Sequence, residues 1–347
     1  MSTIRDVAAR AGVSITTVSR YLRGEHIQSA DAVSQACSDL DYTPAPAART
    51  LRSGRHNAVG VIVPDITNPF FASAVRGIES VCRAASYSLV LYHTDEDSEL
   101  EAQVLREVRR QTDGLIIAPA DGHPGYPSSI DPRRVPVVLL DREIEGVSLD
   151  CVLVDNEGGG RQAATYLLSL GHTRIGEISG PLHTTPGEAR HQGFIKTLAD
   201  GGVEDPEAYH LEGDFREEGG YQAMLRLLAL PRPPTAVFSA NNLQTIGALK
   251  ALRDMGVRVP EEMSIIGFDD LDLASLLSPA LTVIDRPTAE QGALAARLLL
   301  AGLHGARRRQ PQRIVLNTRL VVRDSCATPQ TNGISPRWSA ANPLPTG

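Results

Sequence analysis

Residues 1–44 carry apolar side chains at helical spacing in three short stretches. The apolar face of the first stretch consists of Ile4, Val7, Ala8 and Ala11. Thr3 is placed to cap this helix and Gly12 to end it. A second stretch covers 15–22 and a third covers 32–40, just before two prolines break the pattern. We therefore expect a small all-helical domain at the front of the chain.

The pattern changes at residue 58, where continuous apolar runs replace the helical spacing. Four runs occupy 58–64, 87–93, 113–119 and 135–141, and four more occupy 174–180, 235–240, 263–269 and 281–285. Stretches with helical character lie between them. Buried strands that alternate with helices are typical of a doubly wound parallel α/β sheet. Two sets of strands predict two subdomains, with a ligand cleft between them at the carboxyl ends of the strands.

Length and charge support a composite molecule. The chain has 347 residues, which is more than a single core usually holds. Its net charge is −7, yet residues 1–56 contain seven arginines against five acidic residues. This asymmetry fits a small nucleic-acid-binding module attached to an acidic body. Only two residues are lysines, Lys196 and Lys250, so phosphate contacts must come mainly from arginine, hydroxyl groups and backbone amides.

Several classes of protein are disfavoured. No apolar run is long enough to span a membrane, and residues 1–10 lack the apolar core of a signal peptide, so we expect a cytoplasmic protein. The four cysteines are scattered, and we expect no metal and no cofactor. No catalytic motif is present: the glycines at 158–160 lack the dinucleotide-binding spacing, and neither His172 nor His191 has an evident catalytic partner. An enzyme is therefore not expected.

The stretch 4–24 has the form of a helix-turn-helix, which points to double-stranded DNA as a partner. Thr16, Thr17 and Ser19 offer hydroxyl groups on the second helix, and Arg20 offers a guanidinium fork that suits guanine. Val18 is expected to face the first helix. A purely structural helical domain is the alternative.

Three segments, AGVSITTVSRYL, DYTPAPAARTLRSGR and VGVIVPDITNPFF, resemble the lactose-repressor and galactose-repressor (LacI/GalR) family of bacterial transcription factors. The resemblance extends from about Ile4 to Cys326. It implies a helix-turn-helix domain (1–44), a hinge helix and linker (45–57) and a periplasmic-binding-protein-like effector and dimerisation domain (58–326). Within that domain we expect an N-subdomain (about 58–156 and 286–313) and a C-subdomain (about 157–285 and 314–326). After the domain we expect a disordered tail (327–347).

The resemblance also implies roles for individual residues in DNA binding. Bases would be read by Ile15, Thr16 and Arg20, while Ser14, Thr17 and Ser19 would contact phosphates or support the helix. In the hinge, Leu51 would enter the minor groove as an apolar wedge, with Ala48 and Arg52 beside it. Family members bind pseudo-palindromic sites as dimers, and the chain shows no C-terminal leucine heptads, so we expect a homodimer. Asp41 stands where the family usually has glycine.

Polar and aromatic residues at the predicted strand ends mark the ligand cleft. The candidates are Asp65, Phe70, Phe71, Asp141, Arg142, Arg190, Phe215, Asn241 and Asp269. Most of these match effector-binding positions of the family. Carboxylates, amides and aromatic faces together suit a sugar. Asn242 replaces the aspartate that is common in the family.

The expected function is a repressor that a small carbohydrate-like effector releases from its operator. Two alternatives stay open. The first is a regulator that needs a corepressor such as a nucleobase or a phosphorylated metabolite, because Arg190 is able to hold an anion. The second is a sugar-binding protein with no role on DNA.

Overall fold

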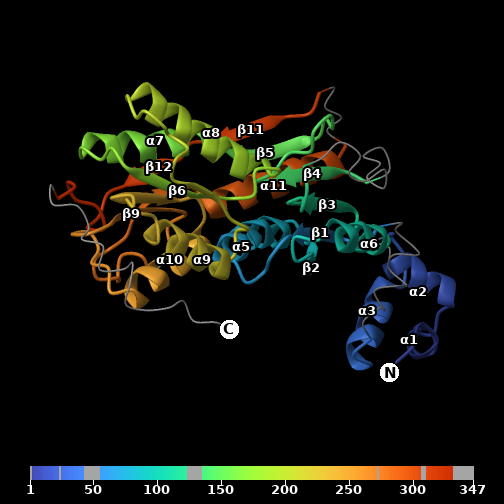
Figure 1. Ribbon diagram of the computed structural model, residues 1–347. Helices are drawn as coiled ribbons and strands as arrows, with labels where there is room; N and C mark the ends of the chain where they lie inside the picture. The colour runs from blue at the N-terminus through green and yellow to red at the C-terminus, as the bar shows by residue number, and fades with distance from the viewer. Residues whose placement is uncertain are drawn as a thin grey trace.

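The computed structural model describes residues 2–22, 25–42, 55–122, 135–271, 273–305 and 310–330. Its first part is a three-helix domain formed by α1 (Ile4–Ala11), α2 (Ile15–Leu22) and α3 (Ala30–Asp39), drawn in blue in Figure 1. One valine from each helix, Val7, Val18 and Val33, is fully buried where the three helices meet. The predicted helical domain is confirmed.

Local hydrogen bonds explain where these helices begin and end. Thr3 and Asp6 form a capping box at the start of α1, and the backbone of Gly12 is left-handed (φ 66°) where that helix ends. The hydroxyl oxygen of Ser14 accepts a hydrogen bond from the Thr17 N–H at 3.1 Å. Asp41 also has a left-handed backbone, with φ 45°, which explains why a glycine suits this position and why aspartate is tolerated there.

The rest of the described chain folds into two α/β lobes. The first sheet consists of β1 (Ala58–Val63), β2 (Ser88–His93), β3 (Gly114–Ile117), β4 (Val137–Leu140), β5 (Asp150–Val154) and β11 (Arg313–Leu316). The second sheet consists of β6 (Ile175–Ser179), β7 (His210–Glu212), β8 (Ala236–Ser239), β9 (Ser264–Phe268), β10 (Thr282–Asp285) and β12 (Arg319–Val321). The predicted α/β fold with two parallel sheets is confirmed.

The two sheets share one strand order. It is β11-β5-β4-β3-β1-β2 in the first and β12-β10-β9-β8-β6-β7 in the second. All pairings are parallel except that of β10 with β12. Each strand of one lobe therefore has a counterpart in the other, and the carboxyl ends of both sets of strands border the same cleft.

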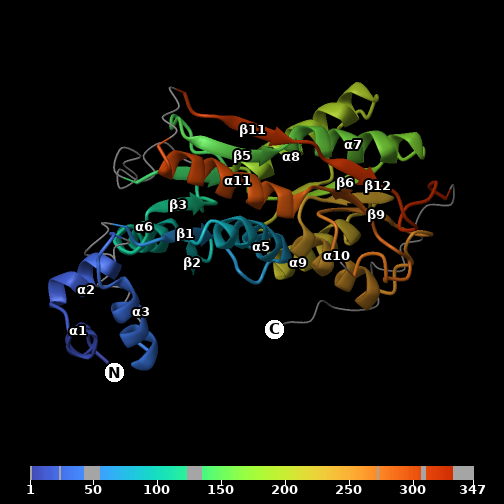
Figure 2. The ribbon, with the colours of Figure 1, turned by 180° about the vertical axis from the view of Figure 1, so that it is seen from behind.

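Helices cover both sheets (Figures 1 and 2). They are α5 (Pro69–Ala84), α6 (Ser98–Val108), α7 (Asn156–Ser169), α8 (Thr185–Asp200), α9 (Glu217–Leu228), α10 (Asn242–Asp254) and α11 (Thr288–Leu303). Three pairs, α5 with α11, α7 with α8 and α9 with α10, pack closely against each other. Glycines make this possible: a Cβ atom on Gly160 of α7 would lie 2.1 Å from the carbonyl oxygen of Arg190 on α8.

The chain passes between the lobes three times: after β5, after β10, and between β11 and β12. The first lobe consists of the first sheet with α5, α6 and α11, and the second lobe consists of the second sheet with α7 to α10. The last crossing lies at 317–318, because β11 stays in the first sheet as far as Leu316. The sequence predicts this crossing a few residues earlier, between 313 and 314. Among the described residues, no helix combines the length and the apolar character needed to cross a membrane.

Candidate functional site

The exposed face of α2 carries the residues expected to read DNA. Ile15 is 46% exposed although it is apolar, and Thr16 and Arg20 are exposed beside it. Ser14 is also exposed, whereas Thr17 and Ser19 are half-buried. The guanidinium of Arg20 donates to the carboxylate of Glu25 at 2.8 Å. Ile15, Thr16 and Arg20 thus give α2 an exposed side, as a helix that enters a groove requires.

The hinge candidates Ala48, Leu51 and Arg52 lie outside the described residues. Their roles at the DNA stay predictions.

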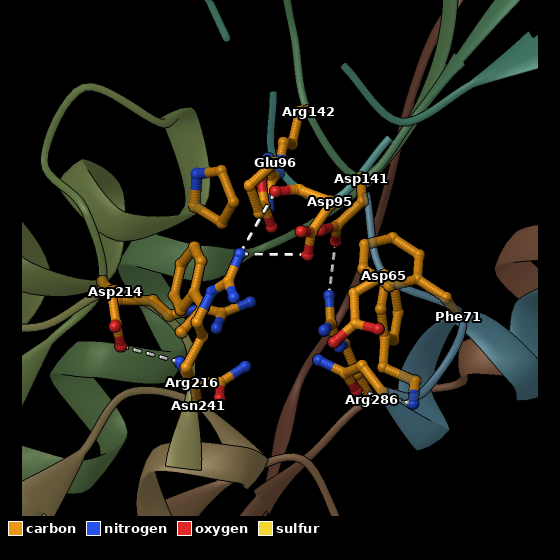
Figure 3. Close-up of a pocket in the computed structure, with 15 residues that line it drawn as sticks. Asp65, Phe71, Asp95, Glu96, Asp141, Arg142, Asp214, Arg216, Asn241 and Arg286 are labelled. Atoms are coloured by element: carbon orange, nitrogen blue, oxygen red, sulfur yellow. Dashed lines mark hydrogen bonds and ion pairs between the residues drawn. The ribbon is translucent and has the colours of Figure 1, made fainter. Parts of the chain in front are cut away.

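A pocket lies between the two lobes. Its walls are formed by Asp65, Asn68, Phe70, Phe71, Asp95, Glu96, Asp141, Arg142, Pro186, Arg190, Asp214, Phe215, Arg216, Asn241 and Arg286. Figure 3 shows side chains from both lobes pointing into one space. Eight of the nine residues predicted for the cleft are among them. The ninth, Asp269, does not line the pocket but pairs with the wall residue Arg286.

Arg286 forms the centre of the charged wall, and sequence reasoning missed it. It is buried, and its guanidinium pairs with Asp141 of the first lobe and with Asp269 of the second, whose Oδ2 accepts from Nη2 at 3.1 Å. It also covers the ring of Phe70, with 3.6 Å between the guanidinium carbon and the ring centroid. Burial alone would raise the pKa of Asp141, but the nearby guanidinium groups, that of Arg286 above all, lower it below its ordinary value.

The same left-handed backbone conformation orients both aspartates. Asp141 follows β4 with φ 67°, and Asp269 follows β9 with φ 74°. The N–H of Asp141 donates to Val152 of β5, and the N–H of Asp269 donates to Ile284 of β10, so the two turns occupy equivalent places in the two sheets. Left-handed backbone at non-glycine residues costs free energy and is found mostly at functional sites.

Arg190 reaches the pocket from α8 and is held by neutral oxygens. Its Nε donates to Asn156 at 2.9 Å, and its Nη1 donates to the carbonyl of Ala240 at 2.6 Å. Burial, reinforced by the charge of Arg286, lowers the pKa of Arg190 to about 9. The group still carries its charge at neutral pH. A buried cation with neutral partners is able to donate to a polar ligand.

Arg142 pairs with Glu96 through two hydrogen bonds, of 2.6 and 2.8 Å, and lies 5.7 Å from the ring centroid of Phe215. Asn241 uses its side-chain oxygen to cap α10. Its amide nitrogen is therefore the group that it offers to a ligand. Asp65 accepts from Thr67 through Oδ1 only, so Oδ2 is left for a ligand hydroxyl within the described structure.

Direct contacts join the lobes across the pocket. The guanidinium of Arg216 in the second lobe donates to the carboxylate of Asp95 in the first at 3.0 Å (Figure 3). Deeper in the cleft, the side-chain amide of Asn242 donates to the side-chain oxygen of Asn68 at 2.8 Å. The structure therefore shows the lobes held together around the pocket.

Sequence reasoning also missed the charged residues Asp95, Glu96, Asp214 and Arg216. Asp214 and Arg216 follow the short strand β7, which no apolar run marks, whereas Asp95 and Glu96 follow the predicted strand 87–93. Arg286 had a signal, since it directly follows the strand 281–285, and the rule that sites gather at carboxyl ends of strands applies to it.

Comparison with known proteins agrees with this architecture. Residues 3–45 match the family model "Bacterial regulatory proteins, lacI family", and residues 164–326 match the model "Periplasmic binding protein-like domain". The ribose operon repressor of Escherichia coli (strain K12) is 36% identical over 307 residues, which cover 86% of this chain and 92% of that protein.

Two solved structures extend the likeness to the whole molecule. A complex of the transcriptional regulator CelR with cellobiose is 32% identical, has a TM-score of 0.72, and is covered over 94% of this chain and 100% of that chain. The lac repressor dimer bound to operator and the anti-inducer ONPF is 26% identical, with a TM-score of 0.80 and coverage of 94% and 99%. The family resemblance inferred from the sequence is thereby confirmed.

The exposed face of α2, the pocket between the lobes and these relatives all agree. The chain belongs to the LacI family of bacterial regulators: it is a DNA-binding transcriptional repressor controlled by a small-molecule effector, and not an enzyme.

Proposed function

We propose that this protein is a homodimeric repressor that a small neutral sugar releases from a pseudo-palindromic operator. The observation that carries the sugar assignment is the charge balance of the pocket. Five carboxylates and four arginines line it, and most of them are already paired with each other. A neutral ligand with many hydroxyl groups exchanges hydrogen bonds with such a wall without adding an unbalanced charge.

The aromatic residues add the second half of a sugar site. Phe70 and Phe71 pack edge to face, with 4.7 Å between their centroids, and Phe215 lines the opposite lobe. Aromatic faces on both sides suit the C–H surfaces of a sugar ring. The names of two relatives, a ribose operon repressor and a regulator bound to cellobiose, support the same class of ligand.

The dimer is inferred from exposed leucines on the second lobe. Leu273, Leu276 and Leu277 are 66%, 77% and 43% exposed and lie close together in sequence after β9. Such a cluster of exposed leucines is unfavourable in water unless another surface covers it. A second copy of this chain is the partner that fits, because the lac repressor relative is a dimer on its operator.

The proposed mechanism couples closure of the lobes to the spacing of the two DNA-binding heads. A sugar bound between the lobes stabilises the contacts of Arg216 with Asp95 and of Asn242 with Asn68. Closure then shifts the first lobes of the two subunits at the dimer interface. This shift separates the paired hinge segments, each of which contains Leu51, the proposed minor-groove wedge. Coupling of this kind is typically worth about 1–3 kcal/mol, or roughly 5- to 150-fold in operator affinity.

The test is selection of bound sequences from random duplex DNA at fixed salt, with and without each member of a panel of pentoses, hexoses, disaccharides, sugar phosphates and nucleobases. The expected result is a pseudo-palindrome that one neutral sugar releases. Tighter DNA binding with a nucleobase or a phosphorylated compound would establish a corepressor instead. Failure of every neutral sugar to change DNA binding would overturn the sugar assignment.

Asp65→Ala provides the residue-level check. Its free carboxylate oxygen is expected to bind a ligand hydroxyl, so the variant should bind the sugar at least tenfold more weakly and keep its operator affinity. Asp205→Asn, a change at an exposed loop position of the second lobe, is the matched control and should behave like the parent protein.

A further inference from the structure

A second cluster of polar groups lies in the second lobe and takes no part in the pocket. It consists of Glu177 on β6, His191 on α8 and His210 at the start of β7. Glu177 and His210 are direct neighbours in the parallel register of β6 and β7, and α8 brings His191 over them. Residues far apart in the sequence are thus assembled by the fold, which is why no motif reveals them.

The three side chains converge closely. Nδ1 of His191 lies 2.7 Å from a carboxylate oxygen of Glu177, and the rings of His191 and His210 stack with 4.3 Å between their centroids. One carboxylate oxygen and one nitrogen from each ring all lie within 4.8 Å of one another. Two ligands of one zinc ion, each about 2.0–2.1 Å from it, are roughly 3.3 Å apart. Shifts of a few tenths of an ångström to about 1.5 Å would complete the geometry.

An independent observation points to a missing cation. Glu177 is only 1% exposed, and its second carboxylate oxygen, Oε1, is buried without a hydrogen-bond partner in the described structure. A buried carboxylate oxygen without a partner is costly, and a bound cation would satisfy it. His191 alone does not do so, because its contact is with the other oxygen, Oε2.

The surroundings favour an ion further. The hydroxyl of Ser179 donates to the carbonyl of Gly180 and so accepts from Nε2–H of His210, which orients that ring and leaves Nδ1 as its free lone pair. Glu207 and Glu212 add negative charge close to both histidines. The histidine side of the cluster is partly open, with 14% of the His191 side chain exposed, so water is able to complete the coordination.

We propose that Glu177, His191 and His210 bind one divalent transition-metal ion per chain, with zinc as the representative ion. Two imidazoles and one carboxylate suit zinc, cobalt and nickel, and they are poor ligands for magnesium and calcium, which take oxygen. The ion would tie α8 to the edge of the second sheet. Since His191 follows Arg190 in α8, it would also stabilise the helix that carries a pocket residue.

The experiment uses the untagged full-length protein after treatment with a chelator. Zinc binding is measured by calorimetry, and cobalt binding by its visible absorption. We expect one ion per chain and a rise in melting temperature of roughly 5 °C at a hundredfold excess over Kd. Glu177→Gln and His210→Gln should each weaken binding at least tenfold, whereas His93→Gln, at an exposed histidine on β2, should not.

A measurement on the parent protein tests the proposal even if the variants fail to fold. X-ray absorption of the zinc-loaded protein should show nitrogen and oxygen neighbours at about 2.0–2.1 Å and no sulfur. Absence of binding to the parent protein would overturn the proposal. So would equal binding by folded cluster variants, or sulfur ligation. None of these outcomes bears on the sugar assignment, because the readouts involve neither DNA nor sugar.

Discussion

Among single residues, Arg286 has the largest electrostatic role in the pocket, because it neutralises one buried carboxylate from each lobe. Asp141 and Asp269 are almost inaccessible to water, with side chains 5% and 6% exposed. Their charges are tolerable only beside a cation, since a buried ion without a partner is strongly unfavourable. The burial of these two carboxylates therefore depends mainly on one side chain.

Replacing that side chain should expose this dependence. Arg286→Met leaves two buried carboxylates unpaired and should lower the free energy of unfolding by about 3–5 kcal/mol in urea titrations. Adding Asp141→Asn and Asp269→Asn to the same chain removes both charges and should recover much of the loss. If the triple variant were no more stable than the single one, the cost would come from lost packing on Phe70 instead.

Glu101 on α6 is a buried carboxyl whose titration should be visible in stability. Burial raises its pKa to about 8 from an ordinary value of 4.5, although the N–H of Ala120 and the charge of Arg142 oppose the shift. Between these two values the folded protein keeps the proton and the unfolded chain has lost it. Stability from this group is therefore complete below pH 4.5, falls as the pH rises, and stops falling above about 8.

Glu101→Gln removes this dependence. The variant should gain about 1–3 kcal/mol over the parent protein as the pH rises from 5 to 8, measured by chemical unfolding at several pH values. Glu99→Gln, at an exposed position on the same helix, should leave the pH profile unchanged. Parallel profiles for the parent protein and Glu101→Gln would show that Glu101 is ionised in the folded state.

At the scale of elements, the close packing of α7 on α8 positions the pocket. Of the three glycines at 158–160, which match no nucleotide-binding motif, Gly160 allows this packing, because its Cβ atom would meet the Arg190 backbone. Cβ atoms at Gly158 and Gly159 would instead meet Asp155, which caps α7, and Phe268 on β9. Gly160 is therefore a packing residue that helps to place Arg190.

Gly160→Ala tests this role. A methyl group 2.1 Å from a backbone oxygen must push the helices apart, at a cost of about 1–3 kcal/mol, and should weaken effector binding by displacing Arg190. Thermal unfolding and sugar titration measure the two effects. Gly302→Ala on α11, where the nearest atom would be 3.9 Å away, should be neutral or stabilising. Normal sugar affinity in Gly160→Ala would separate the packing from the pocket.

The sequence predicted most strands that form a continuous apolar run, with the buried strand β5 as the exception, and it missed the three shortest partly exposed strands. All eight predicted runs became strands, including the fully buried β1 and β9. The short edge strands β7, β11 and β12 are partly exposed, so their residues form no such run, and β5 was overlooked between two loops.

The same limit applied to the site. Many residues at strand ends were found, but partners supplied by loops that follow no predicted strand, such as Asp214 and Arg216, depend on how two distant segments meet. The spacing of residues along the sequence does not show which distant segments come into contact. The pairing of Glu177 with His210 depends in the same way on the register of two strands.

At the scale of the whole molecule, Asn242 explains a departure from the family pattern. Its amide donates across the cleft to Asn68, whose oxygen also accepts the N–H of Phe70 and so cannot turn away. Asn242→Asp would place a carboxylate against that oxygen and should weaken the closed arrangement, lowering effector affinity about 5- to 50-fold. Effector titration and small-angle scattering measure this. Gln222→Glu, an exposed amide-to-carboxylate change on α9, is the control.

The leucine cluster after β9 is predicted to hold the dimer. Leu276→Glu should convert the protein to a monomer in sedimentation experiments and lower operator affinity by at least tenfold, because the two heads would then bind separately. Val315→Glu on β11, also at an exposed apolar residue, should leave the dimer intact. A Leu276→Glu protein that remained dimeric would move the interface to another surface.

The three crossings between the lobes have a consequence for how such regulators can be recombined. The DNA-binding head joins the rest of the chain once, between residues 42 and 58, so a single genetic joint is enough to give the protein the head of another regulator. Each lobe, by contrast, is interrupted in the gene by parts of the other, and exchanging one lobe needs several joints that must all match. Hybrids with new operators should therefore be easy to obtain, whereas new ligand responses should arise by point changes within the pocket.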